Sequence, residues 1–114
     1  MTGISLTAAK SDVAILMPVF VAKPEFRAAL QNELTKLQAH SREDHGCVDY
    51  SVFVDANDLD RFILYEEWST EEALHAHNEQ EHVKNFLDVV PDWLVRPLEV
   101  TRLRTVGNGA PEGP

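Results

Sequence analysis

The sequence predicts an α+β domain of the ferredoxin-like type, with the element order β-α-β-β-α-β and a four-stranded antiparallel sheet. Two observations support this fold class. Short apolar segments rich in branched and aromatic residues alternate with longer segments in which apolar residues recur at helical spacing. The second and third of the short segments are separated only by the turn-forming stretch DANDLD, as in a hairpin.

The first strand is expected at Val13–Ala22, an almost continuous apolar run of the kind found in strands that are buried on both faces. Pro18 lies inside this run and cannot donate a ladder hydrogen bond, so we expect a bulge or a local sheet edge there. A helix should follow from Pro24, which suits a first helical position, to about His40. Its apolar residues recur at helical spacing: Phe26, Ala29, Leu30, Leu34 and Leu37.

Two further strands are expected at Cys47–Val54 and Arg61–Trp68. Between them lies Asp55–Asp60, which is rich in Asp and Asn and favours a turn, so the two strands should pair as a hairpin. The polar segment Ser41–Gly46 should connect the first helix to this hairpin.

A second helix should begin at Ser69, because the sequence STEE at residues 69–72 fits a capping box. Another helical segment is expected over Glu81–Leu94, with a break or kink imposed by Pro91. The last strand is expected at about Pro97–Val106.

The chain has 114 residues, which suffices for one domain with its own core. We expect that domain at residues 12–106. Residues 1–11 show no sustained periodicity and should form a flexible arm, and the Gly- and Pro-rich residues 107–114 should form a disordered tail.

Composition restricts the classes of partner. The formal net charge of -9 argues against binding to nucleic acid or to an anionic membrane, since both require a basic face. No apolar run approaches the roughly 18 residues of a transmembrane helix, and no secretory signal is recognisable. The single cysteine, Cys47, fits a reducing cytoplasm.

The predicted sheet leaves little room for a polar face in water. Helices would cover one face only, yet both sets of alternating strand positions are largely apolar: Val52, Phe53, Val54, Ile63, Leu64 and Tyr65. Burying both faces requires a second sheet, most simply from another copy of the chain, so we expect a homodimer.

Three titratable side chains are candidates for acid–base chemistry. His77 shares a helical face with Ala73, and that face should look toward the sheet, where a histidine could act as a general base near neutral pH. Glu66 lies on an otherwise apolar strand face, where an acid needs a partner or has a raised pKa. His82 could line the same pocket. A structural role is the alternative for each of them.

Aromatic side chains could form the walls of a pocket or bond a substrate oxygen. The candidates for substrate binding are Phe62, Trp68, Tyr50, Tyr65, Phe86 and Trp93. Core packing is the alternative for Phe62, Trp68 and Trp93.

Neither a metal nor another cofactor is expected. His75, His77 and His82 are close in sequence, but His75 and His77 are two residues apart and should point to different helix faces. The sequence has no H-E-x-x-H or paired-cysteine motif, and no Gly-rich loop of the kind that cradles nucleotides.

Three stretches resemble the antibiotic biosynthesis monooxygenase family. The family core F-x-L-Y-E-x-W…A…H…H…F is matched by FILYEEW at residues 62–68 and by Ala73, His77, His82 and Phe86. The family connection S-R-x-E-x-G-C…Y is similar to SREDHGC at residues 41–47 followed by Tyr50, and residues 21–24 resemble the end of the family's first strand. The similarity extends over about residues 13–103.

This resemblance implies a dimeric α+β barrel with a pocket between sheet and helices in each subunit, and cofactor-free oxidation of quinols or polycyclic aromatics. The branch that oxidises polycyclic aromatics uses an Asn, a Trp and a Tyr, of which Trp68 and Tyr65 could supply two. Haem-degrading relatives use an Asn in the first strand and a Trp on the second helical segment. Here residues 17–19 are Met-Pro-Val and His77 stands in place of that Trp, which disfavours haem.

We therefore expect a cytoplasmic, cofactor-independent monooxygenase. His77 or Glu66 would deprotonate a small quinol- or phenol-like substrate, and the electron-rich anion would react with molecular oxygen. Two alternatives stay open. One is an isomerase of a small hydroxy-ketone, as in an autoinducer-processing branch of the family, for which Arg42, Lys84 and Arg96 could hold a phosphate. The other is a non-catalytic module that binds small molecules.

Overall fold

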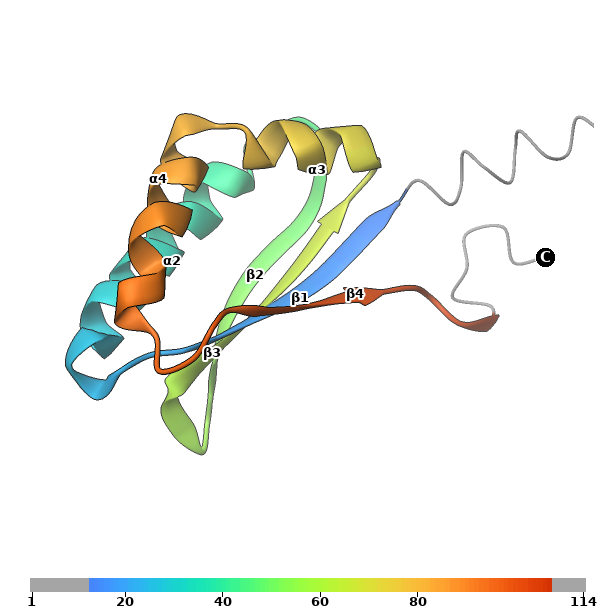
Figure 1. The fold of residues 1–114 in the computed structure, drawn as a ribbon. Coiled ribbons are helices and arrows are strands. Elements are labelled where there is room, and N and C mark those ends of the chain that lie inside the picture. Colours follow the sequence, from blue (N-terminus) through green and yellow to red (C-terminus); the bar gives the residue numbers. More distant parts are fainter. Residues whose placement is uncertain (1–12, 108–114) are drawn as a thin grey trace, which may run out of the picture.

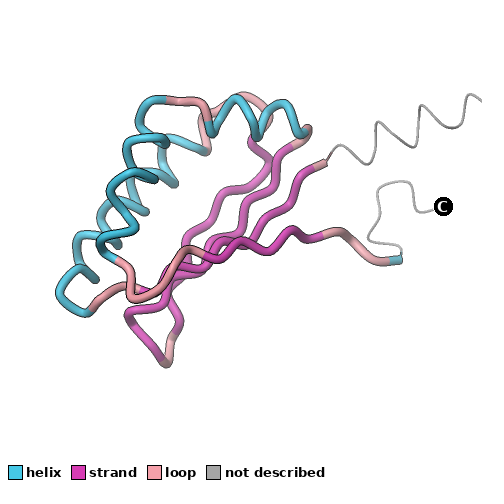
Figure 2. The backbone as a smooth tube through the Cα atoms, in the orientation of Figure 1, coloured by secondary structure: helices cyan, strands magenta, loops and turns pink. Residues whose placement is uncertain are grey.

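A computed structural model describes residues 13–107 of the chain. Its four-stranded sheet has the order β2-β3-β1-β4, all neighbouring strands are antiparallel, and the helices lie on one face (Figures 1 and 2). In chain order the elements are β1 (Ala14–Val21), η1 (Pro24–Phe26), α2 (Arg27–Ser41), β2 (Cys47–Asp55), β3 (Asp58–Trp68), α3 (Glu71–Asn78), α4 (Glu81–Val89), η2 (Val90–Trp93) and β4 (Glu99–Leu103). This confirms the ferredoxin-like fold class.

The arm predicted for residues 1–11 lies outside the described residues, as does the tail predicted for residues 107–114 apart from Gly107. Within residues 13–107, none of the helices has both the length and the apolar character needed to cross a membrane.

Pro18 interrupts one ladder of the sheet without shifting its register. β1 lies between β3 and β4, so a residue without an N–H must cost pairing on one side. The pairing of β1 with β3 stops after Leu16 and resumes at Val19 in the same register, while Pro18 lies opposite Val100 of β4. A local gap in one ladder therefore accommodates the proline, and β1 carries no bulge at this point.

The first helical region begins at Pro24 as predicted, but its first turn is the 3-10 helix η1, and α2 starts at Arg27. α2 ends at Ser41, one residue beyond the predicted end. Its buried positions include Leu30, Leu34 and Leu37, which confirms the predicted helical spacing.

The hairpin has longer strands and a tighter turn than predicted, since only Ala56 and Asn57 separate β2 from β3. Asp55 stabilises this turn with both carboxylate oxygens. Oδ1 accepts a hydrogen bond from the backbone N–H of Asn57 at 2.8 Å, and Oδ2 lies 3.1 Å from Arg61 Nη1. Asp55, Asp58 and Asp60, which the sequence places in a six-residue turn, therefore belong to the two strands.

The capping residue of α3 is Thr70, not Ser69 as predicted. Thr70 Oγ1 accepts a hydrogen bond from the N–H of Ala73 at 3.0 Å, whereas the N–H of Ser69 donates to the carbonyl of Gly46 at 2.8 Å. The backbone of Ser69 thus belongs to the end of the hairpin, and α3 begins at Glu71.

The α-helix ends before Pro91, as predicted: α4 stops at Val89 and the 3-10 helix η2 follows. The last strand is shorter than predicted. β4 covers only Glu99–Leu103, the stretch that pairs with residues 15–19 of β1.

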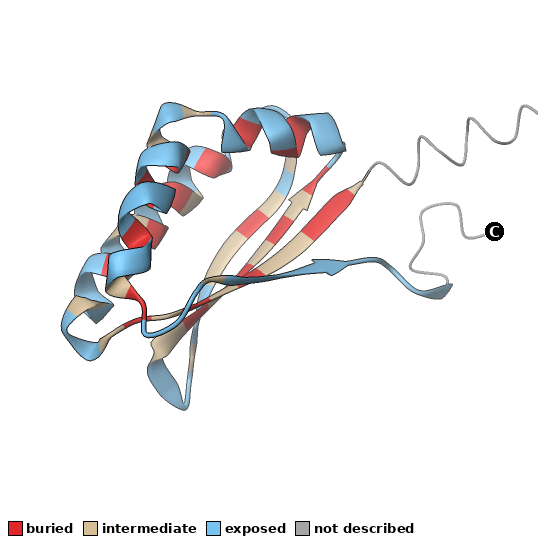
Figure 3. Ribbon diagram, viewed as in Figure 1, coloured by how far each residue is buried: buried red, intermediate tan, exposed pale blue. Residues whose placement is uncertain are grey.

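The two faces of the sheet differ in what covers them. Along β1 and β3, buried positions alternate with less buried ones (Figure 3). The large side chains on the face toward the helices are buried in the core: Phe20, Tyr50, Phe62, Leu64 and Trp68. The opposite face has no helix over it. It carries Met17, Val19, Ile63 and Phe53, and the last of these is 54% exposed.

Candidate active site

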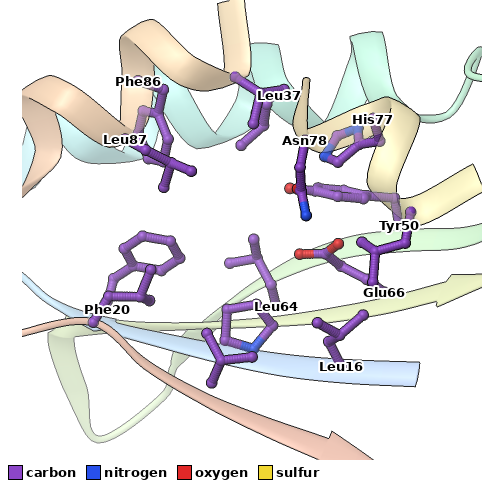
Figure 4. A pocket seen from close by; sticks show the side chains of 15 residues that line it. Leu16, Phe20, Leu37, Tyr50, Leu64, Glu66, His77, Asn78, Phe86 and Leu87 are labelled. Carbon is purple, nitrogen blue, oxygen red and sulfur yellow. The ribbon is translucent and has the colours of Figure 1, made fainter. Parts of the chain in front are cut away.

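A cavity of about 270 Å³ lies between the helix-facing side of the sheet and the helical layer (Figure 4). Its walls are mainly apolar and come from β1, β3, α4 and the segment before β4: Leu16, Phe20, Leu64, Phe86, Leu87 and Leu98. Polar side chains gather at one end, where Glu66 of β3, Tyr50 of β2, and His77 and Asn78 of α3 line the space. The volume lies just below the usual range for small-molecule pockets, so a small ligand fits it best.

Glu66 is held in an apolar setting on β3. It pairs with Leu16 on β1 and with Tyr50 on β2, and only 7% of its surface is exposed. Trp68 Nε1 donates a hydrogen bond to Glu66 Oε1 at 3.1 Å, and the carboxyl group points into the cavity (Figure 4). Burial raises the pKa of Glu66, while the Trp68 bond and the charge of a protonated His77 partly oppose this rise. The site therefore favours a carboxyl that can hold a proton.

His77 reaches the cavity from the opposite wall. It lies in the last turn of α3 with 3% of its surface exposed, and its ring contacts those of Trp68 and Tyr50 at centroid distances of 4.6 and 5.8 Å. Its Nδ1 atom lies 2.8 Å from Asp44 Oδ2. Among the described residues Nε2 has no hydrogen-bond partner, so this nitrogen is free for a ligand in the cavity.

Tyr50 closes the polar end of the cavity. The side chain is almost completely buried, and burial, followed by the negative charge of Glu66, raises the pKa of its hydroxyl group. The hydroxyl therefore stays protonated. Its ring meets Trp68 edge-on, at a centroid distance of 6.4 Å.

The loop between α2 and β2 brings Asp44 to this site. Gly46 adopts a φ of +84°, and a side chain at this position would collide with Ala73 of α3, so only glycine lets the loop pass this close to the helix. On the other side of the loop, Arg42 Nε donates to the backbone carbonyl of Tyr50 at 2.8 Å. The loop is thus fixed to both α3 and β2.

The structure brings four of the nine predicted site residues to the cavity, namely His77, Glu66, Tyr50 and Phe86. Trp68 lies behind them, in contact with Glu66 and His77. Phe62 is buried in the core between sheet and helices.

The other three predicted residues lie elsewhere. Tyr65 is on the opposite face of β3, where its hydroxyl donates to Glu67 at 3.1 Å. His82 stacks against His40, with ring centroids 4.8 Å apart. Trp93 stacks on Phe26 at 6.0 Å. None of them lines this cavity.

Two residues at the site were not predicted. Asn78 points into the cavity beside Glu66 (Figure 4). Asp44 lies 33 positions before His77, so no local period connects them. In the sequence, Asp44 is marked only by its place in the SREDHGC stretch, which resembles the family connection. In the described part of the chain, no group of three or more His, Cys, Asp and Glu side chains is arranged to hold a metal ion.

The arrangement suits proton transfer between two walls. Burial raises the pKa of the Glu66 carboxyl, which faces the cavity from the sheet, and the imidazole of His77 lines the cavity from α3. One can donate a hydrogen bond to a substrate oxygen while the other accepts a proton. The apolar remainder of the cavity suits a small ring or chain.

Comparison with known proteins agrees with this architecture. Residues 14–89 match the model of the family described as "Antibiotic biosynthesis monooxygenase". The chain is 32% identical over 88 residues to YcnE of Bacillus subtilis, covering 77% of this chain and 93% of that protein. It is 31% identical over 93 residues to Rv0793 of Mycobacterium tuberculosis, covering 82% and 90%.

Solved structures show the same fold. That of Rv0793 superposes with a TM-score of 0.78 over 82% of this chain and 95% of its own, at 26% identity. That of PA3566 from Pseudomonas aeruginosa also gives 0.78, over 86% and 98%, at 28% identity. With the family model covering most of the described residues and relatives matching along nearly their whole length, the chain belongs to the antibiotic biosynthesis monooxygenase family.

Proposed function

We propose that this protein is a cofactor-independent monooxygenase of a small, electron-rich phenol or quinol. The observation that carries the proposal is the pair of proton-handling groups, Glu66 on the sheet and His77 on α3, in a largely apolar cavity. YcnE and Rv0793, which are both named "Putative monooxygenase", support the reaction class.

The chemistry begins with removal of the phenolic proton by His77. The phenolate, held in an apolar cavity, passes one electron to molecular oxygen, and the resulting radical and superoxide combine to form a carbon–oxygen bond at a ring C–H carbon. Protonation of the peroxide, for which Glu66 is placed, allows the O–O bond to break. The substituted carbon becomes a carbonyl, one oxygen atom stays on the ring, and the other leaves as water.

An oxygen electrode tests this proposal. Purified protein treated with chelator is mixed with a panel of naphthols and reduced naphthoquinones, and uptake is compared with autoxidation. We expect uptake without added cofactor and a decrease of roughly 10²–10⁴-fold in His77→Ala. His75→Ala, an exposed histidine on the same helix, is the matched control and should retain activity. Uptake that never exceeds autoxidation would rule the proposal out.

The same pair of groups also supports a second candidate, the isomerisation of a hydroxy-ketone, in which His77 removes a proton from carbon and Glu66 protonates the carbonyl. A phosphorylated substrate finds no support, because the three cations considered for it do not line the cavity. Arg42 binds the carbonyl of Tyr50, Lys84 pairs with Glu79, and Arg96 lines a neighbouring hollow beside η2 that shares Leu87 and Leu98 with the cavity. Substrate deuterium exchange without oxygen would identify the isomerase.

We also propose that the chain forms a homodimer through the helix-free face of its sheet. The support is the set of apolar side chains on that face, of which Phe53 is 54% exposed. Two such faces packed together would form the closed α+β barrel that the family resemblance implies.

A further inference from the structure

The Asp44 carboxylate connects the loop before β2 with both ends of the α3–α4 junction. Oδ2 lies 2.8 Å from His77 Nδ1, in the last turn of α3, and Oδ1 accepts a hydrogen bond from Gln80 Nε2 at 3.0 Å. Gln80 is the residue that precedes α4. Only 15% of the Asp44 side chain is exposed, so this contact is largely shielded from water.

This geometry determines which nitrogen of a neutral His77 carries the proton. An ionised carboxylate can only accept hydrogen bonds, so Nδ1, at 2.8 Å from Asp44, must carry the hydrogen. The lone pair of the neutral ring is then on Nε2, the nitrogen without a partner among the described residues. The Gln80 bond occupies the other carboxylate oxygen and restricts rotation of the group.

The position of Asp44 does not depend on its side chain. The N–H of Asp44 donates to the carbonyl of Ser41 at 3.0 Å, and the carbonyl of Asp44 accepts from the N–H of Cys47 at 3.1 Å. Gly46 and Arg42 fix the rest of the loop. A substitution that changes only the charge and donor pattern of the Asp44 side chain should therefore leave the loop in place.

We propose that Asp44 is a positioning residue for His77. It holds the ring in the tautomer protonated on Nδ1, directs the basic Nε2 atom into the cavity, and stabilises the imidazolium that forms when Nε2 accepts the substrate proton. The statement about the tautomer stands on the geometry alone. The statement about the imidazolium rests on the proposed function.

Nitrogen NMR of the histidines tests the tautomer without any substrate. In protein labelled with ¹⁵N at histidine, neutral His77 should show a protonated Nδ1 and an unprotonated Nε2. Asp44→Asn keeps the size of the side chain but offers an NH₂ donor, so His77 should shift toward the tautomer protonated on Nε2. Asp49→Asn is the matched control and should resemble the wild type, because within residues 13–107 the Asp49 carboxylate accepts a side-chain hydrogen bond from Ser51 alone.

Kinetics test the effect on catalysis. With any substrate that is turned over, Asp44→Asn should lower kcat by roughly 10²-fold or more while KM changes little, because the base is present in the wrong tautomer. A wild-type spectrum with the proton on Nε2 would overturn the inference even if no variant folds, and so would an unchanged tautomer with full turnover in Asp44→Asn. If the spectra agree and no phenol or quinol consumes oxygen, the tautomer assignment stands and the proposed function fails.

Discussion

Glu66 is an ionisable side chain whose surroundings in the fold differ strongly from those in the unfolded chain. It is an acid on the buried face of β3, with one hydrogen bond from Trp68 and no cation of fixed charge beside it among the described residues. Because burial raises its pKa, the folded state binds a proton more tightly than the unfolded state. The stabilisation that this gives is present at low pH and disappears as the pH rises through the folded-state pKa.

Glu66→Gln should therefore unfold at higher urea concentration than the wild type at pH 8, because glutamine accepts the Trp68 bond without a buried charge. The advantage should shrink as the pH falls toward 5. Urea unfolding at several pH values measures it, with Glu67→Gln, on the opposite face of the same strand, as the control for losing one charge. A difference that stays constant with pH would contradict this account of Glu66.

The orientation of a single side chain could be predicted where strand alternation or helical spacing applied to it. The alternation of β3 placed Glu66 on the buried face, and helical spacing placed His77 toward the sheet. The same alternation puts Tyr65 on the opposite face from Glu66, so its predicted role conflicted with a period that the sequence already shows. Asp44 depends on a tertiary contact across 33 positions, which no local pattern encodes.

At the scale of elements, the loop that carries Asp44 depends on Gly46. Gly46→Ala should destabilise the fold by about 2–4 kcal/mol, since it combines a left-handed backbone with a collision against Ala73. Thermal or urea unfolding measures the loss. Gly107→Ala is the matched control, because Gly107 also has a positive φ but no atom lies within 4 Å of an added Cβ. Equal losses in both variants would show that the contact with α3 is unimportant.

The start of α3 gives a second prediction at this scale. Thr70→Ala should cost about 1 kcal/mol of unfolding free energy, because it removes the cap on the N–H of Ala73. Ser69→Ala should stay within about 0.5 kcal/mol, since Ser69 is exposed and does not cap the helix. Chemical denaturation compares the two. A larger loss in the serine variant would restore the cap that the sequence predicts.

The order and type of the elements followed from the sequence, and their ends did not. Apolar periodicity identified the strands and helices and their break before Pro91. The ends depended on competing hydrogen bonds, as at Ser69, which donates to Gly46, and at Asp55, whose side chain supports a two-residue turn. The short β4 reflects the extent of its pairing with β1, which is a tertiary property.

For the whole molecule, the helix-free face of the sheet predicts self-association. Light scattering should give twice the 12.8 kDa chain mass for the wild type and the mass of one chain for Phe53→Asp. Val89→Asp, at an exposed apolar position on the helical layer, is the control and should remain a dimer. A dimer that survives Phe53→Asp and dissociates with Val89→Asp would place the interface on the helices.

The most direct test of the central claim is to follow the atoms of oxygen. Chelator-treated protein is given a naphthol under ¹⁸O₂, and the product is analysed by mass spectrometry. We predict one ¹⁸O atom per product molecule, no release of hydrogen peroxide, and a loss of roughly 10²–10⁴-fold in rate for His77→Ala. A product without ¹⁸O, or incorporation that is unchanged in His77→Ala, would contradict a cofactor-independent monooxygenase that uses His77 as its base.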